Sequence, residues 1–478
     1  MPELAEPALG DAPVLPYSPK IYSIAAHRGF ADALVAGLIP RYADSEVGLA
    51  RLTLLLASQR AARTITEAFV RVSGAGMLLP RLVVVGDLDL DEALGTLFDP
   101  IDTDIDIPPA AAPTRRWLRL AEHLRAVQGD DAASGVALLR QARAMAQTMD
   151  RLAVEGIDPA QLLADDVIGI VGDQSAHWQR SSAAFLRVWA HWQAELDARG
   201  EVDAPTRRNR LLDQAARAWS ANPPINPIVA VGVTSASPAI ARLLRVVAGL
   251  PQGAVILPDL DLALDDNVWD LLGRAGKADA PGEPPFARGD AVTHPQYHLK
   301  LLLHRMGVAR DEVRPWHRAG LGAAPPARSR AISSLFLPPL ACSRWVGLPE
   351  PQRRLAGVRL MASEHPGAEA TAIAILIRQA LEVPERRVAL ITPDRGLAGR
   401  VVAQLRRWQI AADDSAGRPL PQTAAGRVLL LLAEVMGEAA PPVPLIALLS
   451  HPLVHADEGR PAWLERVREL DLALRGPR

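Results

Sequence analysis

Short apolar runs alternate along the chain with longer segments in which apolar residues recur at helical spacing. In the N-terminal half we interpret the apolar runs as buried parallel strands, at 21–25, 52–56, 82–85, 228–233 and 254–257. Each of the first two runs is followed by a helical pattern. This alternation is typical of a parallel sheet covered by helices, so the pattern predicts an α/β fold.

The third and fourth runs are separated by a long stretch of helical patterns, from Trp117 to Ala221. Prolines mark its entrance at 108–113, and Asn222-Pro223-Pro224 mark its exit, which indicates a helical insertion within the sheet domain. Four aromatic residues in the insertion follow helical spacing, namely Trp178, Phe185, Trp189 and Trp192. They could stack on nucleic-acid bases, but the spacing favours a core stripe.

A second α/β unit is predicted in the C-terminal part of the chain. We expect strands at 358–361 and 388–392, each followed by a helix, at 367–381 and 397–408. A segment rich in Pro, Gly and Ala at 320–330 predicts a surface loop before this unit. The expected layout is a flexible N-terminus (1–20), a first α/β domain in two parts (21–108 and 225–350), the insertion (109–224) and a second α/β domain (351–478).

Composition narrows the class of protein. With 478 residues, 49% hydrophobic and 22% charged, the chain is long enough for several folded domains. A net charge of −2 argues against a broadly basic surface, so any DNA contact must come from local patches. The single cysteine, Cys342, excludes a disulfide framework within this sequence, and we expect it to be inert. No apolar run is long enough to span a membrane, and the acidic, proline-broken start is unlike a signal peptide, so we expect a cytoplasmic protein.

The first strand-to-helix junction, 21–34, lies where a P-loop ATPase would hold the phosphates of its nucleotide. Such a loop needs G-x-x-x-x-G-K-[ST], because its amides wrap the phosphates, its lysine reaches them and its hydroxyl binds magnesium. Here Gly29 is the only glycine of the junction, Phe30 stands in the lysine position and Ala31 in the hydroxyl position. The sequence therefore predicts a degenerate and non-functional nucleotide loop around Arg28 and Gly29.

The second junction, at 54–69, is a better candidate for binding phosphate groups. A helix N-terminus presents free amides and the positive end of a dipole, and basic side chains follow directly. We expect Ser58, Gln59, Arg60 and Arg63 to contact the backbone of single-stranded DNA, with a solvated helix face as the alternative. The corresponding junction of the second unit offers Thr392 and Arg395 as further DNA-binding residues.

Other clusters carry less specific signals. Two acidic sets, Asp87, Asp89, Asp91 and Asp102, Asp104, Asp106, lack the pattern of a calcium loop and are predicted to be solvated. His294, His298 and His304 have zinc-like spacing, but Pro295 lies inside the motif and favours a structural role. A short basic run, Arg207, Arg208 and Arg210, is predicted to lie on the surface.

The order of these motifs resembles the superfamily 1 helicases, and more specifically the AddB-type, helicase-like subunits of AddAB double-strand-break repair helicase–nucleases. The matching segments are 21–34 at the Walker A position, 56–62 (L-A-S-Q-R-A-A) at motif Ia, 228–235 at Walker B, 361–370 at the opening of the second motor domain, and 388–420 after it. Two further runs resemble the AddB-type subunits in particular, at 86–89 and 294–303.

The resemblance implies a helicase-like subunit that takes part in double-strand DNA break repair by recombination. It would bind single-stranded DNA and duplex ends, recognise a hotspot sequence, and form a heterodimer with an AddA-type helicase–nuclease. Because the Walker A lysine is missing and Gly232 and Val233 replace the Walker B acids, we expect this subunit to be catalytically inactive.

The family's nuclease domain and its cysteine-held iron–sulfur cluster would need a C-terminal region beyond this sequence. We therefore expect no cofactor in this chain, and a truncated member or a fragment with an incomplete second motor domain. Two alternatives remain open: an active ATPase or helicase with a divergent loop at Arg28 and Gly29, or a partner-docking remnant that does not contact DNA.

Overall fold

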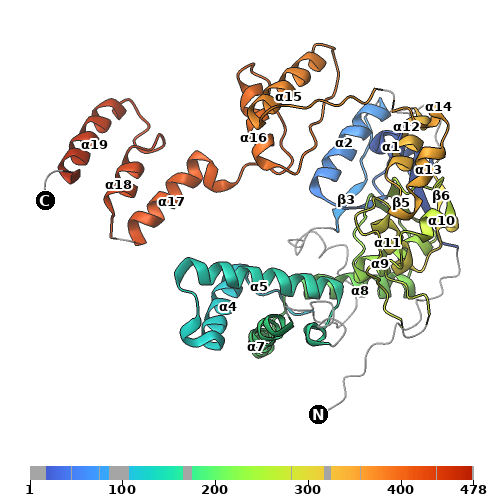
Figure 1. Ribbon diagram of the computed structural model, residues 1–478, viewed down its shortest axis with the longest axis horizontal. Helices are drawn as coiled ribbons and strands as arrows, with labels where there is room; N and C mark the ends of the chain where they lie inside the picture. Colours follow the sequence, from blue (N-terminus) through green and yellow to red (C-terminus); the bar gives the residue numbers. More distant parts are fainter. Residues whose placement is uncertain are drawn as a thin grey trace. The chain divides into compact units, whose positions relative to one another are not determined.

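A computed structural model describes residues 18–44, 46–74, 76–85, 107–164, 175–280, 283–316, 325–355, 357–437 and 439–475. The chain divides into two compact units, Met1–Gly357 and Val358–Arg478 (Figure 1). The boundary lies slightly beyond the one expected from the sequence, because the short helix α14 (Glu350–Arg353) belongs to the first unit.

The first unit is built on a six-stranded parallel sheet with the strand order β3-β2-β4-β5-β1-β6. The strands are β1 (Ile21–Ile24), β2 (Thr53–Leu56), β3 (Arg81–Val84), β4 (Ile228–Val231), β5 (Gly253–Pro258) and β6 (Arg314–Pro315). The first five lie where the apolar runs predicted strands. The edge strand β6 was not expected, because its two residues are exposed and one of them is proline.

Helices cover both faces of the sheet. Side chains alternate along each strand, so Leu54 and Leu56 face one core while Leu55 faces the other. The first core contains residues of α1 (Phe30–Tyr42) and α2 (Gln59–Ser73). The second contains residues of α8 (Ala204–Ala221), α9 (Pro238–Gly249) and α11 (Tyr297–Met306). Burial on both faces explains why the strands read as continuous apolar runs.

The region predicted as a helical insertion is helical in the described residues, although its last helix, α8, packs on the sheet. It consists of α4 (Pro113–Gln128), η1 (Gly129–Asp131), α5 (Gly135–Glu155), η2 (Pro159–Leu163), α7 (Ser175–Arg199) and α8. Phe185 and Trp192 are buried in its core and Trp189 packs against them, as the aromatic spacing predicted. The fourth aromatic residue, Trp178, donates its indole N–H to the carbonyl of Leu162 at 2.9 Å.

The interpretation of the basic run in α8 as surface is wrong for Arg208. Only 6% of this residue is exposed, and its guanidinium donates to the carbonyl of Val85 at 3.2 Å. Its neighbour Arg210 is exposed, as expected. Arg208 therefore joins α8 to the end of β3, a contact that the local sequence does not reveal.

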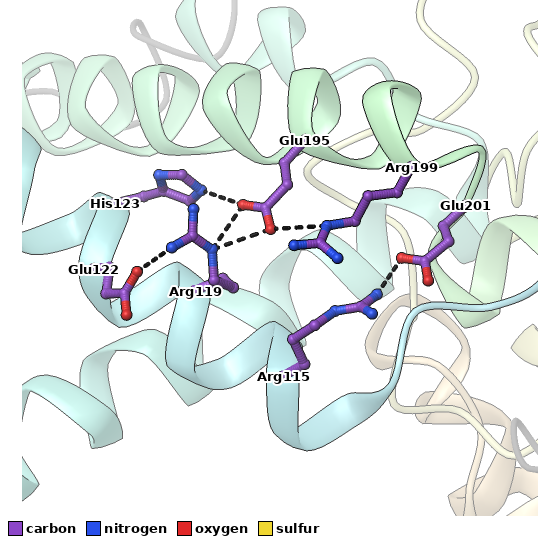
Figure 2. A network of polar contacts seen from close by, with 7 residues as sticks. All are labelled: Arg115, Arg119, Glu122, His123, Glu195, Arg199 and Glu201. Atoms are coloured by element: carbon purple, nitrogen blue, oxygen red, sulfur yellow. Dashed lines mark hydrogen bonds and ion pairs between the residues drawn. The ribbon is translucent and has the colours of Figure 1, made fainter.

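A network of ion pairs and hydrogen bonds between side chains joins α4 to α7 (Figure 2). Glu195 of α7 accepts hydrogen bonds from Nε of Arg119 at 2.9 and 3.0 Å and contacts Nε2 of His123 at 3.1 Å. Burial alone would raise the pKa of Glu195, but these partners outweigh it and hold the pKa below its usual value. Arg199 pairs with the same carboxylate, while Arg119 also pairs with Glu122, and Arg115 with Glu201.

Short helices complete the first unit: α10 (Asp266–Asp270), η4 (Arg310–Glu312), α12 (Pro326–Leu335), η5 (Pro339–Ala341), α13 (Ser343–Gly347) and α14. The loop expected at 320–330 is wrong beyond residue 325, because α12 starts at Pro326. Proline is well suited to a first helical position, since its fixed φ fits the helix and its missing N–H has no partner there. The residues before 325 in this loop lie outside the described part of the chain.

The second unit is helical in the residues that the structure describes. Its elements are α15 (Pro366–Leu381), α16 (Arg395–Arg406), η6 (Leu420–Gln422), α17 (Ala424–Gly437), α18 (Pro442–Leu449) and α19 (Arg460–Arg475). The helices predicted at 367–381 and 397–408 are thus confirmed. They pack against each other through small and apolar side chains, Ala370, Ala374, Leu397, Val401 and Leu405.

The strands expected at 358–361 and 388–392 are wrong: these described residues form no strand. Leu360 is 98% exposed and Ile391 is 94% exposed, although a buried strand would cover both. The physical reason is that a strand needs a neighbour to pair its N–H and C=O groups, and no described residue supplies one here. Among the helices that the structure describes, none combines the length and the apolar composition that a membrane crossing needs.

Candidate functional site at the carboxyl edge of the sheet

The strand registers place the two candidate junctions at the same edge of the sheet. Leu56 at the end of β2 is paired with Val231 of β4, which is paired with Ile256 of β5. Ile24 at the end of β1 is paired with Pro258, also on β5. The loops after β1, β2, β4 and β5 therefore emerge together, at the carboxyl edge where ligands of open parallel sheets bind.

At the predicted nucleotide loop, Arg28 is directed to the protein backbone. Its N–H closes a turn on the carbonyl of Ala25 at 3.0 Å, and its guanidinium donates to the carbonyl of Trp316, after β6, at 3.3 Å. Gly29 is the N-cap of α1, with an extended backbone at φ −65°. The loop thus has the shape of a strand-to-helix junction, but the guanidinium of its arginine, Arg28, is hydrogen-bonded to a protein carbonyl.

The residues that the motif order places at the lysine and acid positions of an ATPase are apolar and lie near each other. Gly232, at the end of β4, has φ +65°, and a Cβ placed on it would lie 3.7 Å from the ring of Phe30. Phe30 also packs against the core beneath α1 and α2. An aromatic ring therefore lies between β4 and α1, where a nucleotide would need a lysine and a magnesium ligand.

A carboxylate occupies the N-terminal turn of α1. Asp32 accepts a hydrogen bond from Nη2 of Arg71 on α2 at 2.7 Å, and its Oδ2 would lie 3.8 Å from a Cβ on Gly29. A negative charge at a helix N-terminus is stabilised by the helix dipole. The ion pair with Arg71 balances this charge, so the carboxylate occupies the helix N-terminus and no cation is left free there for a phosphate group.

The N-terminus of α2 has the opposite character. Ser58 caps the helix, its Oγ accepting from the N–H of Ala61 at 3.2 Å. Gln59 and Arg60 are exposed, and the first turn of α2 contains no acid. Arg63 is 74% exposed and lies 3.4 Å from Glu67 of the same helix, a weak surface pair that a phosphate could displace.

Next to the degenerate loop lies a pocket of about 460 Å³. It is lined by the loops 25–28, 259–263 and 294–296 and by one side of α12. Gln296 joins its own loop, 294–296, to the loop 259–263. Its Nε2 donates to the carbonyl of Asp259 and its Oε1 accepts from the N–H of Asp261, both at 2.9 Å. Ser333 of α12 donates to the carboxylate of Asp261, so α12 is fixed over the pocket.

Asp259 is the most unusual residue of this pocket. Its φ is +51°, and its Oδ1 accepts from the N–H of Ala26 at 3.2 Å. Burial raises the pKa of Asp259, against the opposing effects of the Ala26 N–H and of His27. The side chain therefore ties the end of β5 to the loop after β1.

The three histidines with zinc-like spacing have separate surroundings. His294 lines the pocket, where its Nδ1 accepts from the N–H of Gln296 at 3.1 Å and burial lowers its pKa. His298 is exposed. His304 donates from Nδ1 to the carbonyls of Arg274 and Ala275 at 3.0 Å, and burial lowers its pKa as well. Within the described ranges, no three His, Cys, Asp or Glu side chains are placed to hold a metal ion.

In the second unit, the two candidates lie at the turn before α16. The hydroxyl of Thr392 accepts from the N–H of Asp394 at 3.1 Å, and Asp394 caps the helix. Arg395 makes a two-pronged pair with Asp414, at 2.9 and 2.6 Å, and this pair raises the pKa of its guanidinium. A DNA phosphate at this turn would have to compete with Asp414 for Arg395.

Several features of the sequence fall elsewhere. The acidic sets between Asp87 and Asp106, and the family-specific run 86–89, lie outside the described residues. Cys342 is exposed.

Sequence reasoning missed the side chains that decide the chemistry of the loop. Asp32 could have been noticed, since it is an acid in the first turn after Gly29. Its pairing with Arg71 and the proximity of Phe30 to Gly232 depend on the packing of distant segments. The structural role of Gln296 likewise has no local signal.

The fold defines a parallel α/β protein with a helical region between β3 and β4, and its first strand-to-helix turn carries the ring of Phe30 and the paired carboxylate of Asp32. The chain matches no protein-family model and no curated protein significantly.

Proposed function

We propose that this chain is a catalytically inactive, helicase-like subunit that acts in double-strand DNA break repair by recombination. It binds single-stranded DNA at the carboxyl edge of its sheet and supports a partner helicase–nuclease of the AddA type. The motif order described above is one support for this proposal. The chemistry of the two strand-to-helix junctions is the other.

One observation carries the proposal, namely the contrast between the N-termini of α1 and α2. Both helices begin at the same edge of the sheet. The turn of α1 carries Asp32 and the ring of Phe30, which oppose a nucleotide. The turn of α2 carries Ser58, Gln59 and Arg60 without an acid, which favours a phosphate backbone.

Binding without hydrolysis is physically coherent. A phosphate backbone needs only cations and amides, whereas ATP hydrolysis needs a lysine on the outer phosphates and an acid for magnesium. In the proposed heterodimer the partner supplies the motor. This subunit supplies additional binding contacts to the DNA strand that the motor moves.

The test is the affinity of the full chain for a single-stranded oligonucleotide of thymidines, followed by fluorescence anisotropy. Replacing Arg60 and Arg63 by alanine should weaken binding about tenfold at about 0.1 M salt, taking about 0.7 kcal/mol for each exposed ion pair. The control replaces Arg288 and Arg314, which are exposed and lie on other segments of the unit.

The two pairs of substitutions remove the same charge, so they separate a local site from a general electrostatic effect. The proposal expects the control to bind as the wild type does. Equal affinities of the Arg60/Arg63 variant and the wild type would contradict the proposal, and would favour a subunit that docks on a partner without contacting DNA at α2.

A further inference from the structure

The solvent-facing side of α5 in the helical insertion carries a stripe of arginines. Arg140, Arg143 and Arg151 are all exposed, and Gln147 is exposed between them. At about 3.6 residues per turn, these four positions fall within an arc of about 80°. The buried side chains of α5, which include Leu138, Ala142 and Met149, lie on the other side of the helix.

No acid interrupts the stripe. The acids of α5 are Asp150 and Glu155, which flank the stripe, and each is paired with an arginine of another helix; Arg116, the partner of Asp150, also pairs with Asp203. Asp150 accepts from Arg116 of α4 at 2.5 Å, and Glu155 lies 2.8 Å from Arg305 of α11. Within the described residues, no carboxylate forms an ion pair with the three arginines of the stripe. In a chain of net charge −2, this is a strongly basic local surface.

An exposed aromatic residue lies beside the stripe. Trp117 of α4 is 38% exposed, and the guanidinium of Arg143 lies 5.5 Å from the centre of its ring. This contact holds Arg143 in place at the surface. It also covers one face of the indole, so the ring is not an open platform on which the bases of a single strand would stack.

We propose that this face of α5 binds the phosphate backbone of duplex DNA, without reading its sequence. Arg143 and Arg151 are eight residues apart, which is about 12 Å along a helix axis. The major groove of B-form DNA is also about 12 Å wide, so α5 lying across it brings arginines to the backbones on both sides. The deep and narrow major groove of duplex RNA does not fit this spacing.

This inference goes beyond the proposed function, since it concerns a different element and a different form of DNA. It predicts that one subunit engages the duplex through the insertion and the single strand through α2. The two sites can fail separately, because they use different arginines.

The test measures binding of the full chain to a DNA duplex whose ends are closed by loops, over a range of salt concentrations. Replacing Arg140, Arg143 and Arg151 by alanine should weaken binding and make log K against log salt shallower by about 2.7, or about 0.9 for each lost phosphate contact. Replacing the same three residues by lysine should preserve most of the salt dependence. The control replaces Arg187, Arg210 and Arg217, exposed arginines of α7 and α8.

Single-stranded DNA and duplex RNA are probed with the same proteins. The inference holds if only the α5 alanine variant loses duplex DNA affinity while its affinity for the single strand stays unchanged. It is overturned if that variant and the control behave alike, or if the loss falls on the single strand or on duplex RNA. Circular dichroism of each variant checks that the helices are intact, and the lysine variant keeps the test decisive if the alanine variant unfolds.

Discussion

At the residue scale, single side chains decide what the carboxyl edge can bind. Phe30 and Gly232 stand where the proposed function expects the polar groups of an ATPase, and a Cβ on Gly232 would lie 3.7 Å from the ring of Phe30. Asp32, paired with Arg71, occupies the N-terminal turn of α1, where a phosphate would lie. Because these residues act together, restoring a lysine at position 30 alone would leave the acid in place and remove an aromatic ring from the core.

The packing of α1 also depends on one residue without a side chain. A Cβ on Gly37 would overlap the indole of Trp316, which cannot move away, because its backbone N–H donates to Ser23 at 2.8 Å and its indole N–H to Ala33 at 2.9 Å. Gly37→Ala should therefore destabilise the first unit by about 2 kcal/mol, despite the better helix propensity of alanine.

Urea unfolding followed by tryptophan fluorescence measures this effect. Gly289→Ala is the matched control, because a Cβ at that position has open space around it and should change stability by less than about 0.5 kcal/mol. If both variants unfold at the same urea concentration, α1 is not packed on Trp316 as described.

At the element scale, the helical insertion is stabilised by ion pairs between its side chains as well as by its apolar core. Glu195 is surrounded by Arg119, His123 and Arg199, and only 12% of its side chain is exposed (Figure 2). A carboxylate this well covered is stabilising only while it is ionised and its hydrogen bonds are kept.

Glu195→Gln keeps the shape of the side chain and removes its charge. It should destabilise the insertion by about 1.5 kcal/mol near neutral pH. The pKa of Glu195 is lower in the folded protein than in the unfolded chain, so its contribution is fully present above about pH 4.3 and is lost as the pH falls through the folded pKa.

Hydrogen exchange of the α7 amides measures this effect element by element. The difference between the wild type and Glu195→Gln should shrink as the pH falls below about 4. A difference of the same size at all pH values would mean that the charge of Glu195 contributes nothing to the stability of α7.

The strands also show which elements the sequence alone predicts and which it does not. Strands β1 to β5 were predictable because burial on both faces gives each an uninterrupted apolar run. The same reasoning failed at 358–361 and 388–392, because an apolar run specifies a strand only where a neighbouring strand is available. Edge strand β6 has too few residues to carry a pattern, and the pairing of Asp32 with Arg71 arises only when α1 and α2 pack together.

At the scale of the whole molecule, the net charge of −2 means that the proposed DNA binding depends on local patches. The N-terminus of α2 and the exposed face of α5 are two such patches in the described part of the chain; the first turn of α2 has no acid, and the two acids of α5 are paired with arginines of other helices. The sequence pointed to the first through its strand-to-helix junction. It did not point to the second, because neither the helical register of α5 nor the pairing of its two acids is visible without the structure.

The proposed function requires that this chain bind single-stranded DNA independently of ATP and that it not hydrolyse ATP. The most direct measurement is ATP turnover by the full chain together with its affinity for single-stranded DNA, with and without magnesium ATP. We expect no turnover and the same DNA affinity in both conditions, since Phe30 and the paired Asp32 occupy the turn that a nucleotide would need. Turnover that Arg28→Ala abolishes, or DNA affinity that changes with ATP, would contradict it and show that the loop after β1 is an active nucleotide site.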